Sequence, residues 1–499
     1  MSFLDSIRRF FQGETISPPP TQIARRGYRA DEIKSALPFR SPKQLQTNWE
    51  SPVITLTDEF RSALNLLEHS NQNVFVTGGA GTGKSTLLKL FKERTSKRVA
   101  VVAPTGVAAL NAGGVTIHSF AHLPPRLINS QIRQQLKPTN NSRKVVRSLD
   151  ALIIDEISMV RADVLDGLHL FLRRARDSNE PFGGLQMIFV GDLFQLPPVC
   201  EDAVATAFGG NPWRSPFFFS ARCLTDQPVK VTPINLTQNQ RQADDENFFR
   251  LLNSLRHGRV TAEFLAAMAE RSNASWPPTS ELTILTPTRQ RAENLNLTEL
   301  AKLQSPEFHF PAKREGTFLN ETDSDENLPA PELLKLRLGA RVMFTKNDSE
   351  GRWVNGSVGR VTCIDENSIE VERTDCAGNP KYIVQPVAWE RIRYRWNDKK
   401  QELAFEVVGS YSQFPLMLAW AMTIHKAQGK TLDKVGIDLT TGAFASGQVY
   451  VALSRSRTLA GIFLRASIKP EDVLIDDRVV AFNDSLNVTS QAPSGAKSL

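Results

Sequence analysis

The feature that most constrains this 499-residue chain is a complete phosphate-binding loop. Within VFVTGGAGTGKST, residues 74–86, the residues Gly78, Gly83, Lys84 and Ser85 satisfy the pattern G-x-x-x-x-G-K-[ST] directly after an apolar run. Glycine is needed because the backbone N–H groups of such a loop turn inward around phosphates, in torsions and at distances that a Cβ would hinder. The loop therefore predicts an α/β fold in which a strand, the loop and a helix N-terminus together hold a nucleotide.

Each part of this loop has an expected role. Lys84 is expected to reach the β and γ phosphates, and the Ser85 hydroxyl is expected to bind Mg²⁺. A glycine-rich turn before a helix is the alternative interpretation, but the strand, loop and helix signals agree with one another here. The expected nucleotide contacts are Gly78, Gly81, Gly83, Lys84, Ser85 and Thr86.

A second segment, AMTIHKAQGKTL at residues 421–432, contains Gly-Lys-Thr, which matches the last three positions of the phosphate-binding pattern. Gly429, Lys430 and Thr431 repeat the letters Gly-Lys-Thr, but Ile424 stands where the leading glycine should be. We therefore expect no second nucleotide site there, and the segment needs another explanation.

Composition favours a soluble protein with an anionic partner. The chain is long enough for about three domains, and 41% hydrophobic with 23% charged residues is ordinary for a globular protein. A net charge of +7 attracts polyphosphates, although many basic proteins bind no nucleic acid. No apolar run is long enough to span a membrane and no signal-peptide core is present, so we expect no membrane association and a cytoplasmic location, nucleoid-associated in a bacterium. Neither C-x-x-C nor His-paired metal spacing occurs among Cys200, Cys223, Cys363 and Cys376, which argues against structural zinc.

Two sets of short apolar segments predict two parallel sheets covered by helices. The first set is Asn73–Val76, Arg98–Ala103, Ala151–Asp155 and Gln186–Val190; the second is Glu281–Leu285, Lys434–Ile437 and Ile462–Leu464, with a helix over Ala445–Ser454. Ligands bind such sheets beyond the carboxyl ends of the strands, where the loop, Asp155 and Asp192 fall.

The pattern changes to alternation between residues 334 and 408. Ser368–Glu372 and Arg391–Trp396 alternate in polarity, and Asn355–Gly356 and Ala377–Pro380 carry turn signals. A small inserted β-barrel is the expected structure. Its alternating Arg and aromatic residues serve nucleic acid in one interpretation; in the other, which alternation favours, the Arg side chains are simply solvated.

Two acids, an amide and two arginines are candidates for the groups that would hydrolyse a nucleotide bound at the loop. Asp155 is expected to hold Mg²⁺ and Glu156 to polarise the attacking water, although paired acids after a strand also cap helices. Gln195 could sense the γ-phosphate. Arg241 and Arg455 could neutralise charge on the transferred phosphoryl group, whereas either one taken singly is more often a surface charge.

Eight motifs in order resemble those of the Pif-type (petite integration frequency) DNA helicases of superfamily one, over roughly residues 53–470. The motifs are Gly78–Thr86, Ala103–Ala108, Thr116–Phe120, Ile154–Ser158, Gly191–Gln195, Arg241–Gln242, Thr423–Thr431 and Tyr450–Arg455. The resemblance implies an α/β fold of two RecA-like P-loop domains, with a small β-barrel inserted in the second and a wedge insertion at about 121–145 in the first. It implies an ATP-dependent DNA helicase that moves 5′ to 3′ on single-stranded DNA and unwinds duplex or other structured DNA in replication, repair or recombination.

The domain boundaries that follow leave two flexible ends. We expect a flexible basic arm at 1–50, the first RecA-like domain at 51–233, the second in two parts at 234–333 and 409–480, the inserted barrel at 334–408 and a flexible tail at 481–499.

The resemblance also assigns roles to individual residues. In similar helicases the segment matching Thr423–Thr431 links the ATP cleft to single-stranded DNA, which accounts for the repeated Gly-Lys-Thr letters. Its polar groups suit phosphate contacts that read no bases. ATP and Mg²⁺ are the implied cofactors, with catalytic residues Lys84, Asp155, Glu156, Gln195, Arg241 and Arg455. The implied DNA contacts are Thr105, Gly106, His118, Phe120, Asn355, Thr423, His425 and Lys426.

Two departures and two alternatives accompany this assignment. Phe60 stands where related proteins often have a Gln that reads adenine, and Gln240 replaces the usual aromatic residue before Arg241. The chain is expected to be a monomer that binds single-stranded and forked DNA. The alternatives are a nucleotide-switched DNA-binding module and a motor subunit resembling the RecD component of a recombination complex. Intact Lys84, Glu156, Arg241 and Arg455 favour a motor over a switch.

Overall fold

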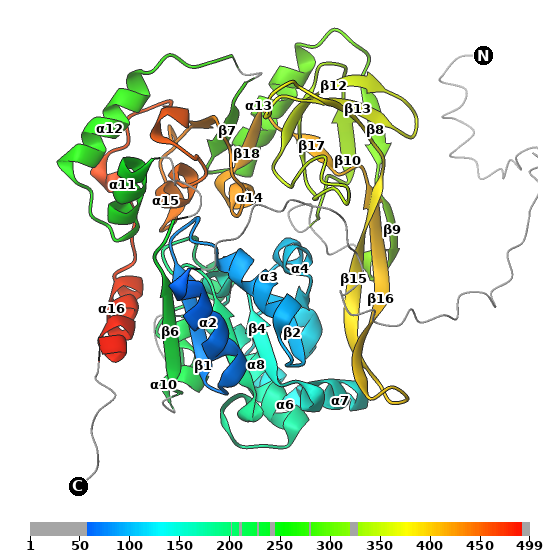
Figure 1. Cartoon of the computed structure of the whole chain (residues 1–499), viewed down its shortest axis with the longest axis vertical. Coiled ribbons are helices and arrows are strands. Elements are labelled where there is room, and N and C mark those ends of the chain that lie inside the picture. Colours follow the sequence, from blue (N-terminus) through cyan, green and yellow to red (C-terminus); the bar gives the residue numbers. More distant parts are fainter. Residues whose placement is uncertain are drawn as a thin grey trace, which may run out of the picture. The chain divides into compact units, whose positions relative to one another are not determined.

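Two parallel β-sheets organise the part of the chain that the computed structural model describes. The described residues are 57–200, 202–208, 212–226, 229–239, 245–278, 281–319 and 328–491, and they belong to the compact unit Pro42–Leu499. The predicted basic arm at 1–50 and residues Gln240 and Arg241 lie outside the described residues. Two parallel sheets in an α/β fold agree with the prediction from sequence (Figure 1).

The first sheet carries the phosphate-binding loop. Its strands are β1 (Asn73–Gly78), β2 (Val99–Ala103), β3 (Val115–Thr116), β4 (Ala151–Ile154), β5 (Gln186–Val190) and β6 (Val231–Leu236), in the order β3-β2-β4-β5-β1-β6. Every pair is parallel. The residues of β4 and β5 are all buried, as expected for strands whose two faces are both covered by other elements.

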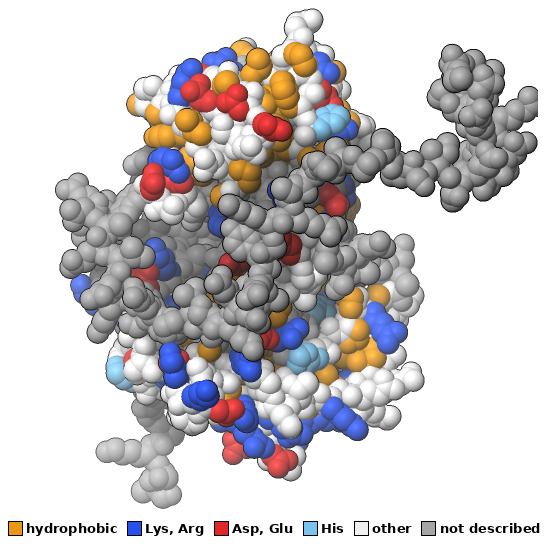
Figure 2. Space-filling model, turned by 90° about the vertical axis from the view of Figure 1, so that its right-hand side faces the viewer, with side chains coloured by type: hydrophobic (Ala, Val, Ile, Leu, Met, Phe, Trp, Pro, Cys, Tyr) orange, Lys and Arg blue, Asp and Glu red, His pale blue; other side chains and the backbone are white. Residues whose placement is uncertain are grey.

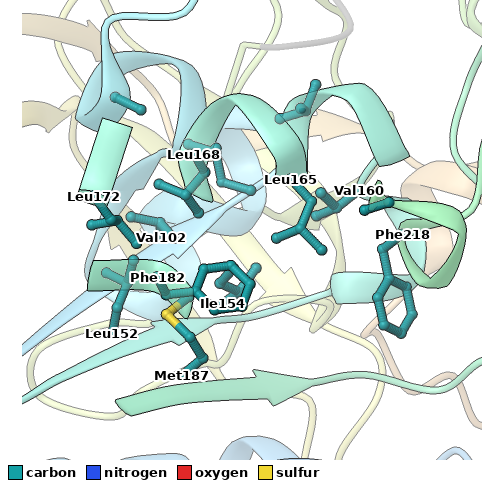
Figure 3. Close-up of a cluster of buried hydrophobic side chains, with 14 of the residues drawn as sticks. Val102, Leu152, Ile154, Val160, Leu165, Leu168, Leu172, Phe182, Met187 and Phe218 are labelled. Atoms are coloured by element: carbon teal, nitrogen blue, oxygen red, sulfur yellow. The ribbon is translucent and has the colours of Figure 1, made fainter. Parts of the chain in front are cut away.

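Helices cover this sheet, and its buried side chains form two apolar clusters. The helices are α2 (Asp58–His69), α3 (Lys84–Arg94), α4 (Gly106–Ala112), α5 (Ile117–Ala121), α6 (Ser130–Gln135), α7 (Asn140–Ser148), α8 (Ala162–Arg176), α9 (Asp202–Ala205) and α10 (Arg222–Thr225). On α8, Leu165, Leu168 and Leu172 share one face and point toward the sheet (Figure 3). There they join the buried cluster that contains Ile154 and Met187. Each fully buried Leu contributes about 1.5–3 kcal/mol, so this face fixes α8 on the sheet.

The second sheet is smaller. Its strands are β7 (Thr283–Thr286), β18 (Ala421–Thr423), β19 (Val435–Ile437) and β20 (Ile462–Leu464), in the order β18-β7-β19-β20, and all pairs are parallel. Its helices are α11 (Glu246–Arg256), α12 (Ala262–Asn273), α13 (Arg289–Ala301), α14 (Ile424–Ala427) and α15 (Gln448–Leu453). Because α14 follows β18 at once, the segment Thr423–Thr431 starts at the carboxyl end of a strand.

Antiparallel strands separate β7 from β18 in the sequence. They are β8 (Phe308–Pro311), β9 (Lys313–Gly316), β10 (Leu333–Leu336), β11 (Arg341–Phe344), β12 (Val358–Ile364), β13 (Ile369–Arg373), β14 (Lys381–Val384), β15 (Val387–Asn397), β16 (Glu402–Gln413) and β17 (Leu416–Leu418). They form a five-stranded sheet, β14-β13-β12-β11-β17, a three-stranded sheet, β15-β16-β9, and the pair β10-β8. Antiparallel pairing therefore extends on both sides of the segment 334–408.

The long hairpin of β15 and β16 contacts the first sheet. The hydroxyl of Tyr394 accepts a hydrogen bond from the backbone N–H of Val101 on β2, at 3.1 Å. Near the hairpin turn, the ammonium of Lys144 on α7 lies 2.7 Å from a carboxylate oxygen of Asp398. Figure 2 views the side on which this hairpin lies in Figure 1, and basic, acidic and hydrophobic side chains are interspersed there. The hairpin thus anchors the antiparallel region to the first sheet.

The last described helix, α16 (Asp477–Gln491), corrects one prediction. Residues 481–491 belong to this helix, so the predicted flexible tail at 481–499 begins too early. The helix forms there because apolar residues return at helical spacing, and they pack against the first sheet's core rather than the second's. The ring of Phe482 stacks on that of Phe219 with centroids 4.5 Å apart. In the described part of the chain, no helix combines the length and apolar character that a membrane span requires.

Candidate active site

The phosphate-binding loop has the backbone geometry that its glycines predict. Gly81 and Gly83 have φ of 85° and 88°, in the left-handed region that favours glycine. A Cβ on Gly78 would lie 2.5 Å from the carbonyl oxygen of Leu236. Lys84 opens α3, and its ammonium donates to the carbonyl oxygens of Gly78 and Gly79 at 2.8 and 3.0 Å. The N-terminus of α3 has no side-chain cap, so its N–H groups are available to an anion.

The acidic pair follows β4 directly beside this loop. Glu156 has φ of 51°, and its N–H donates to the carboxylate of Asp155 at 3.0 Å. Burial, together with the neighbouring Asp155 charge, raises the pKa of Glu156 to about 7 against the opposing charges of Lys84 and Arg455. Burial also raises the pKa of Asp155. A carboxylate with a pKa near neutrality is suited to accept a proton from water.

A buried network joins the two sheets at the loop. Arg256, the last residue of α11, donates from Nε to the Asp192 carboxylate at 2.9 Å. The Tyr450 hydroxyl of α15 donates to the same carboxylate at 3.1 Å and accepts from the backbone N–H of Ala80 at 2.8 Å. Burial opposes the ionisation of Asp192, but the Arg256 charge outweighs it and holds the pKa of Asp192 below its usual range. Ala80 and Leu196 pack in the apolar cluster of the second sheet, so the hydrogen-bond network lies in a buried, largely apolar interface.

A second set of contacts crosses the same interface. The side-chain amide of Gln428 donates to the Glu156 carboxylate and to the Gln195 side-chain oxygen, both at 3.1 Å. Gln195 in turn donates to Asp192 at 3.3 Å. The water-polarising candidate, the γ-phosphate-sensing candidate and the Thr423–Thr431 segment are therefore in direct contact.

Arg455 packs against the backbone of the segment Thr423–Thr431. Its guanidinium is 1% exposed, and it donates to the carbonyl oxygens of Val451, Ala427 and Lys430 at 2.8, 3.3 and 3.2 Å. Its charge also lowers the pKa of Glu156, which places it within electrostatic range of the acidic pair. The second predicted arginine, Arg241, lies outside the described residues.

The DNA contacts predicted in the first domain lie along α4 and α5. Thr105 caps α4, accepting from the N–H of Ala108 at 3.2 Å, and Gly106 begins that helix. Burial and the Arg161 charge lower the pKa of His118. The ring of Phe120 is 8% exposed and packs edge-on against Phe171 and Tyr394, at 6.1 and 6.2 Å between centroids. In this conformation the hairpin residue Tyr394 therefore covers Phe120.

The contacts predicted in the second domain surround α14. Thr423 caps this helix, its hydroxyl accepting from the N–H of Lys426 at 3.2 Å, and Lys426 is exposed while His425 is partly exposed. Lys430 donates from Nζ to the side-chain oxygen of Asn355 in the antiparallel region. Burial lowers the pKa of Lys430 to about 8. Lys430 follows the four-residue helix α14, and Ile424 is the first residue of that helix.

The donor set fits a magnesium ion that arrives with a nucleotide. Within the described residues, no cluster of three or more His, Cys, Asp and Glu side chains could hold a metal by itself. The Ser85 hydroxyl and the Asp155 carboxylate offer hard oxygen ligands at the loop. Mg²⁺ is commonly bound through one or two protein oxygens together with phosphates and water.

Comparison with known proteins decides the family. A family model described as PIF1-like helicase matches residues 55–265. The ATP-dependent DNA helicase Pif1 of Bdellovibrio bacteriovorus is 34% identical over 439 residues, which cover 86% of this chain and 92% of that protein. This chain belongs to the PIF1-like helicase family. The prediction of an ATP-dependent DNA helicase is thereby confirmed. The human ATP-dependent DNA helicase PIF1 is 35% identical over 422 residues, and the chain spans 61% of its length.

Solved structures of PIF1-like helicases have the same fold. Bacteroides sp Pif1 in complex with ADP-AlF4 is 35% identical, with a TM-score of 0.77 over 87% of this chain and 97% of that one. Bacteroides Pif1 bound to single-stranded DNA is 36% identical, with a TM-score of 0.64 over 87% of this chain and 98% of that one. The α/β architecture with parallel-sheet cores is therefore that of the family.

The structure brings most of the predicted cleft residues together and adds others. Lys84, Asp155, Glu156 and Gln195 surround the loop, and Arg455 faces them from the second sheet. Sequence reasoning missed Arg256, because no motif marks a buried Arg at the end of a helix. It also gave no role to Tyr450 or Gln428, although both lie inside motifs. Phe60, in place of an adenine-reading Gln, is 4% exposed and packs in the core below β1.

Proposed function

We propose that this PIF1-like helicase converts ATP hydrolysis at the loop into 5′ to 3′ movement along single-stranded DNA. The observation that supports it best is the buried network of Asp192, Arg256, Tyr450 and Ala80. A nucleotide at the loop must alter contacts that hold the second sheet, so each cycle of binding and hydrolysis closes and reopens the interface. The two domains bind and release the DNA strand in turn, so each cycle moves the protein along the strand.

Within the cleft, each residue has one proposed task. Lys84 leaves its carbonyl partners to bind the β and γ phosphates, and the loop N–H groups from Gly78 to Thr86 hold the remaining oxygens. Ser85 and Asp155 would hold Mg²⁺, and a bound Mg²⁺ would neutralise phosphate charge. Glu156 accepts the proton of the attacking water, and Gln195 orients that water or senses the γ-phosphate.

Two arginines complete the proposed catalytic set. Arg455 lies within electrostatic range of Glu156 and supplies positive charge to the second-sheet side of the cleft. Arg241 is proposed as the second arginine of the site, from its motif alone. An arginine that neutralises a transferred phosphoryl group contributes about 10³- to 10⁵-fold to the rate.

The proposed strand path crosses both sheets. In the first domain it runs over Thr105, Gly106, His118 and Phe120; in the second it runs over Thr423, His425 and Lys426, with Asn355 at the edge of the antiparallel region. Backbone and side-chain donors of these types bind phosphates without reading bases. Contact of the strand with Phe120 requires Tyr394 to move away from the ring, because Tyr394 covers it here.

The remaining assignments follow the family. We infer a first RecA-like domain at 51–233, a second at 234–333 and 409–480, and an inserted barrel near 334–408. The helices α6 and α7 occupy the proposed wedge at about 121–145, where strands would separate. Bacteroides Pif1 has been solved with single-stranded DNA and as two coordinating helicases at forked double-stranded DNA. We propose the same DNA classes for this chain, a monomeric state in solution, a cytoplasmic location and a role in replication, repair or recombination.

One experiment separates a motor from its two rivals. Unwinding is measured on forked duplexes with only a 5′ tail or only a 3′ tail, beside ATPase with and without oligothymidylate. A 5′-to-3′ motor unwinds the 5′-tailed duplex and hydrolyses ATP faster with the strand. Strand binding without unwinding would support a nucleotide switch. Unwinding only after a partner protein is added would support a RecD-like subunit.

A further inference from the structure

Gln428 occupies a position that links the strand-binding segment to the cleft. It is the residue after α14, and its backbone N–H donates to the carbonyl of His425 at 3.1 Å. Its side-chain amide reaches across the interface to Glu156 and Gln195. One residue therefore touches both the turn that carries Thr423, His425 and Lys426 and the carboxylate that must activate water.

The turn between these two contacts is held tightly. Thr423 caps its start, and the N–H of Lys430 donates to the carbonyl of Ala427 at 3.0 Å at its end. Ile424 and Ala427 are fully buried beneath it. Arg455 binds the carbonyls of Ala427 and Lys430 from the opposite side. Because so short a turn has little internal freedom, a shift of its exposed side moves the Gln428 amide with it.

The contact that Gln428 makes is unfavourable for catalysis. A hydrogen bond donated to the Glu156 carboxylate occupies an oxygen lone pair that would otherwise accept a proton from the attacking water. The same amide also occupies the Gln195 oxygen, so one side chain engages both groups that face the attacking water. Glu156 and Gln428 are both partly exposed, and the bond between them is partly buried.

We propose that Gln428 is a positioning residue that restrains Glu156 until single-stranded DNA engages α14 and draws the amide away. This rests on the proposed strand-binding role of the segment. It explains how phosphate contacts on one side of a single helical turn accelerate hydrolysis on the other. Gln428 touches neither the strand nor the nucleotide in this account; it acts through Glu156.

The test removes the amide and keeps its volume. Gln428→Met is compared with the wild-type full chain for ATPase without DNA, ATPase with saturating oligothymidylate, and oligothymidylate affinity. We expect the DNA-free rate to rise about fivefold, since a charged group has lost one hydrogen bond. The DNA-saturated rate should change less than about twofold, because the strand already withdraws Gln428 there. Stimulation by DNA therefore falls while strand affinity stays the same.

The Michaelis constant for ATP distinguishes restraint from a packing defect. Loss of the donor frees Glu156 without changing the phosphate-binding loop, so the DNA-free kcat of the variant rises while its KM for ATP stays the same. Gln290→Met makes the same chemical change on the exposed face of α13 and should alter none of these quantities. Gln428→Leu is a second variant, with the same expected direction, if Gln428→Met does not fold.

Three results would overturn the inference. They are an unchanged DNA-free rate, a fall in both rates by a common factor, and a raised KM for ATP. If the wild-type ATPase does not respond to oligothymidylate, the proposed function itself fails, and this outcome is recognised before any variant is made.

Discussion

Lys84 and Lys430 follow glycine and precede a hydroxyl residue in the same way, yet their surroundings differ in every physical respect. Lys84 opens an eleven-residue helix after a glycine loop, and it donates to the carbonyls of that loop. Lys430 follows a four-residue helix and donates to Asn355 of the antiparallel region. Burial lowers the pKa of Lys430 to about 8, so its charge is costly where it lies. The comparison teaches that the backbone before the lysine, rather than the Gly-Lys-Thr letters, makes a phosphate site.

The largest effect is expected at the first lysine. Lys84→Ala should reduce ATP hydrolysis to background, a loss of about 10³-fold, because a preorganised charge aimed at the phosphates is removed. Strand binding should stay within about twofold, since its residues are spread over both sheets. Steady-state ATPase and fluorescence anisotropy of a labelled oligonucleotide measure the two. Substantial ATPase in this variant would refute the assignment of the loop.

The second largest effect on ATP hydrolysis is expected at Glu156, the carboxylate beside the phosphate-binding loop. Glu156→Gln should lower hydrolysis by about 10²- to 10³-fold and leave nucleotide binding intact, because the amide keeps the shape but accepts no proton. Calorimetric titration with a non-hydrolysable ATP analogue provides the control. Turnover near the wild-type rate would mean that another group positions the water.

The pH dependence of ATP hydrolysis is a second test of Glu156 as the proton acceptor. Because burial raises the pKa of Glu156 to about 7, the charged, proton-accepting form is scarce at pH 6 and predominant at pH 8. The DNA-free ATPase should therefore rise with pH across this interval, by up to about tenfold per unit below the pKa. An ordinary Glu, with a pKa of about 4.3, would give a flat profile there. The rise should disappear in Glu156→Gln.

The segment around the second lysine should respond to DNA instead. Lys426→Ala should reduce DNA stimulation of the ATPase several-fold and weaken binding equally for strands of different sequence, because phosphate contacts carry no base information. The slope of log affinity against log salt should fall by up to about 0.7, one contact's share on a single strand. His425→Ala should reduce stimulation in the same direction. Binding that changes with base sequence would argue against phosphate contacts.

The smallest effect on nucleotide binding is expected at the second lysine itself. Lys430→Ala should leave one nucleotide per chain in calorimetry, as in the unmodified protein, since Lys430 faces Asn355. If the unmodified chain bound two nucleotides and Lys430→Ala bound one, the segment Gly429–Thr431 would be a second phosphate-binding site.

Regular features were predictable from the sequence, whereas contacts between distant segments were not. The glycine pattern fixed the loop because φ values near 85° at Gly81 and Gly83 exclude most other residues. Apolar runs such as Gln186–Val190 located strands because both sheet faces are covered. By contrast, β18 was not predicted, because its three residues end in a polar Thr423 and lead directly into α14, so no separate apolar run marks the strand. The pairing of Arg256 with Asp192 depends on how two sheets meet, and no local pattern encodes that.

The hairpin of β15 and β16 illustrates the same limit. Its alternation predicted strands, and the solvated-arginine interpretation fits Arg393 and Arg395, which lie within 3.8 and 3.4 Å of Glu406. Alternation could not reveal that Tyr394 and Trp396 pack on the first sheet's core. That information resides in the complementary surface of α5 and α7, far away in the sequence.

The return of α16 to the first sheet has a consequence for synthesis of the chain on the ribosome. Phe218 and Phe219 pack in the first core, but the ring that stacks on Phe219 and meets Phe218 edge-on belongs to Phe482, near the end of the described residues. At roughly 5–20 residues per second, the delay between these segments is on the order of tens of seconds. During that time the nascent first domain lacks part of its apolar cover, which is the surface a chaperone would hold.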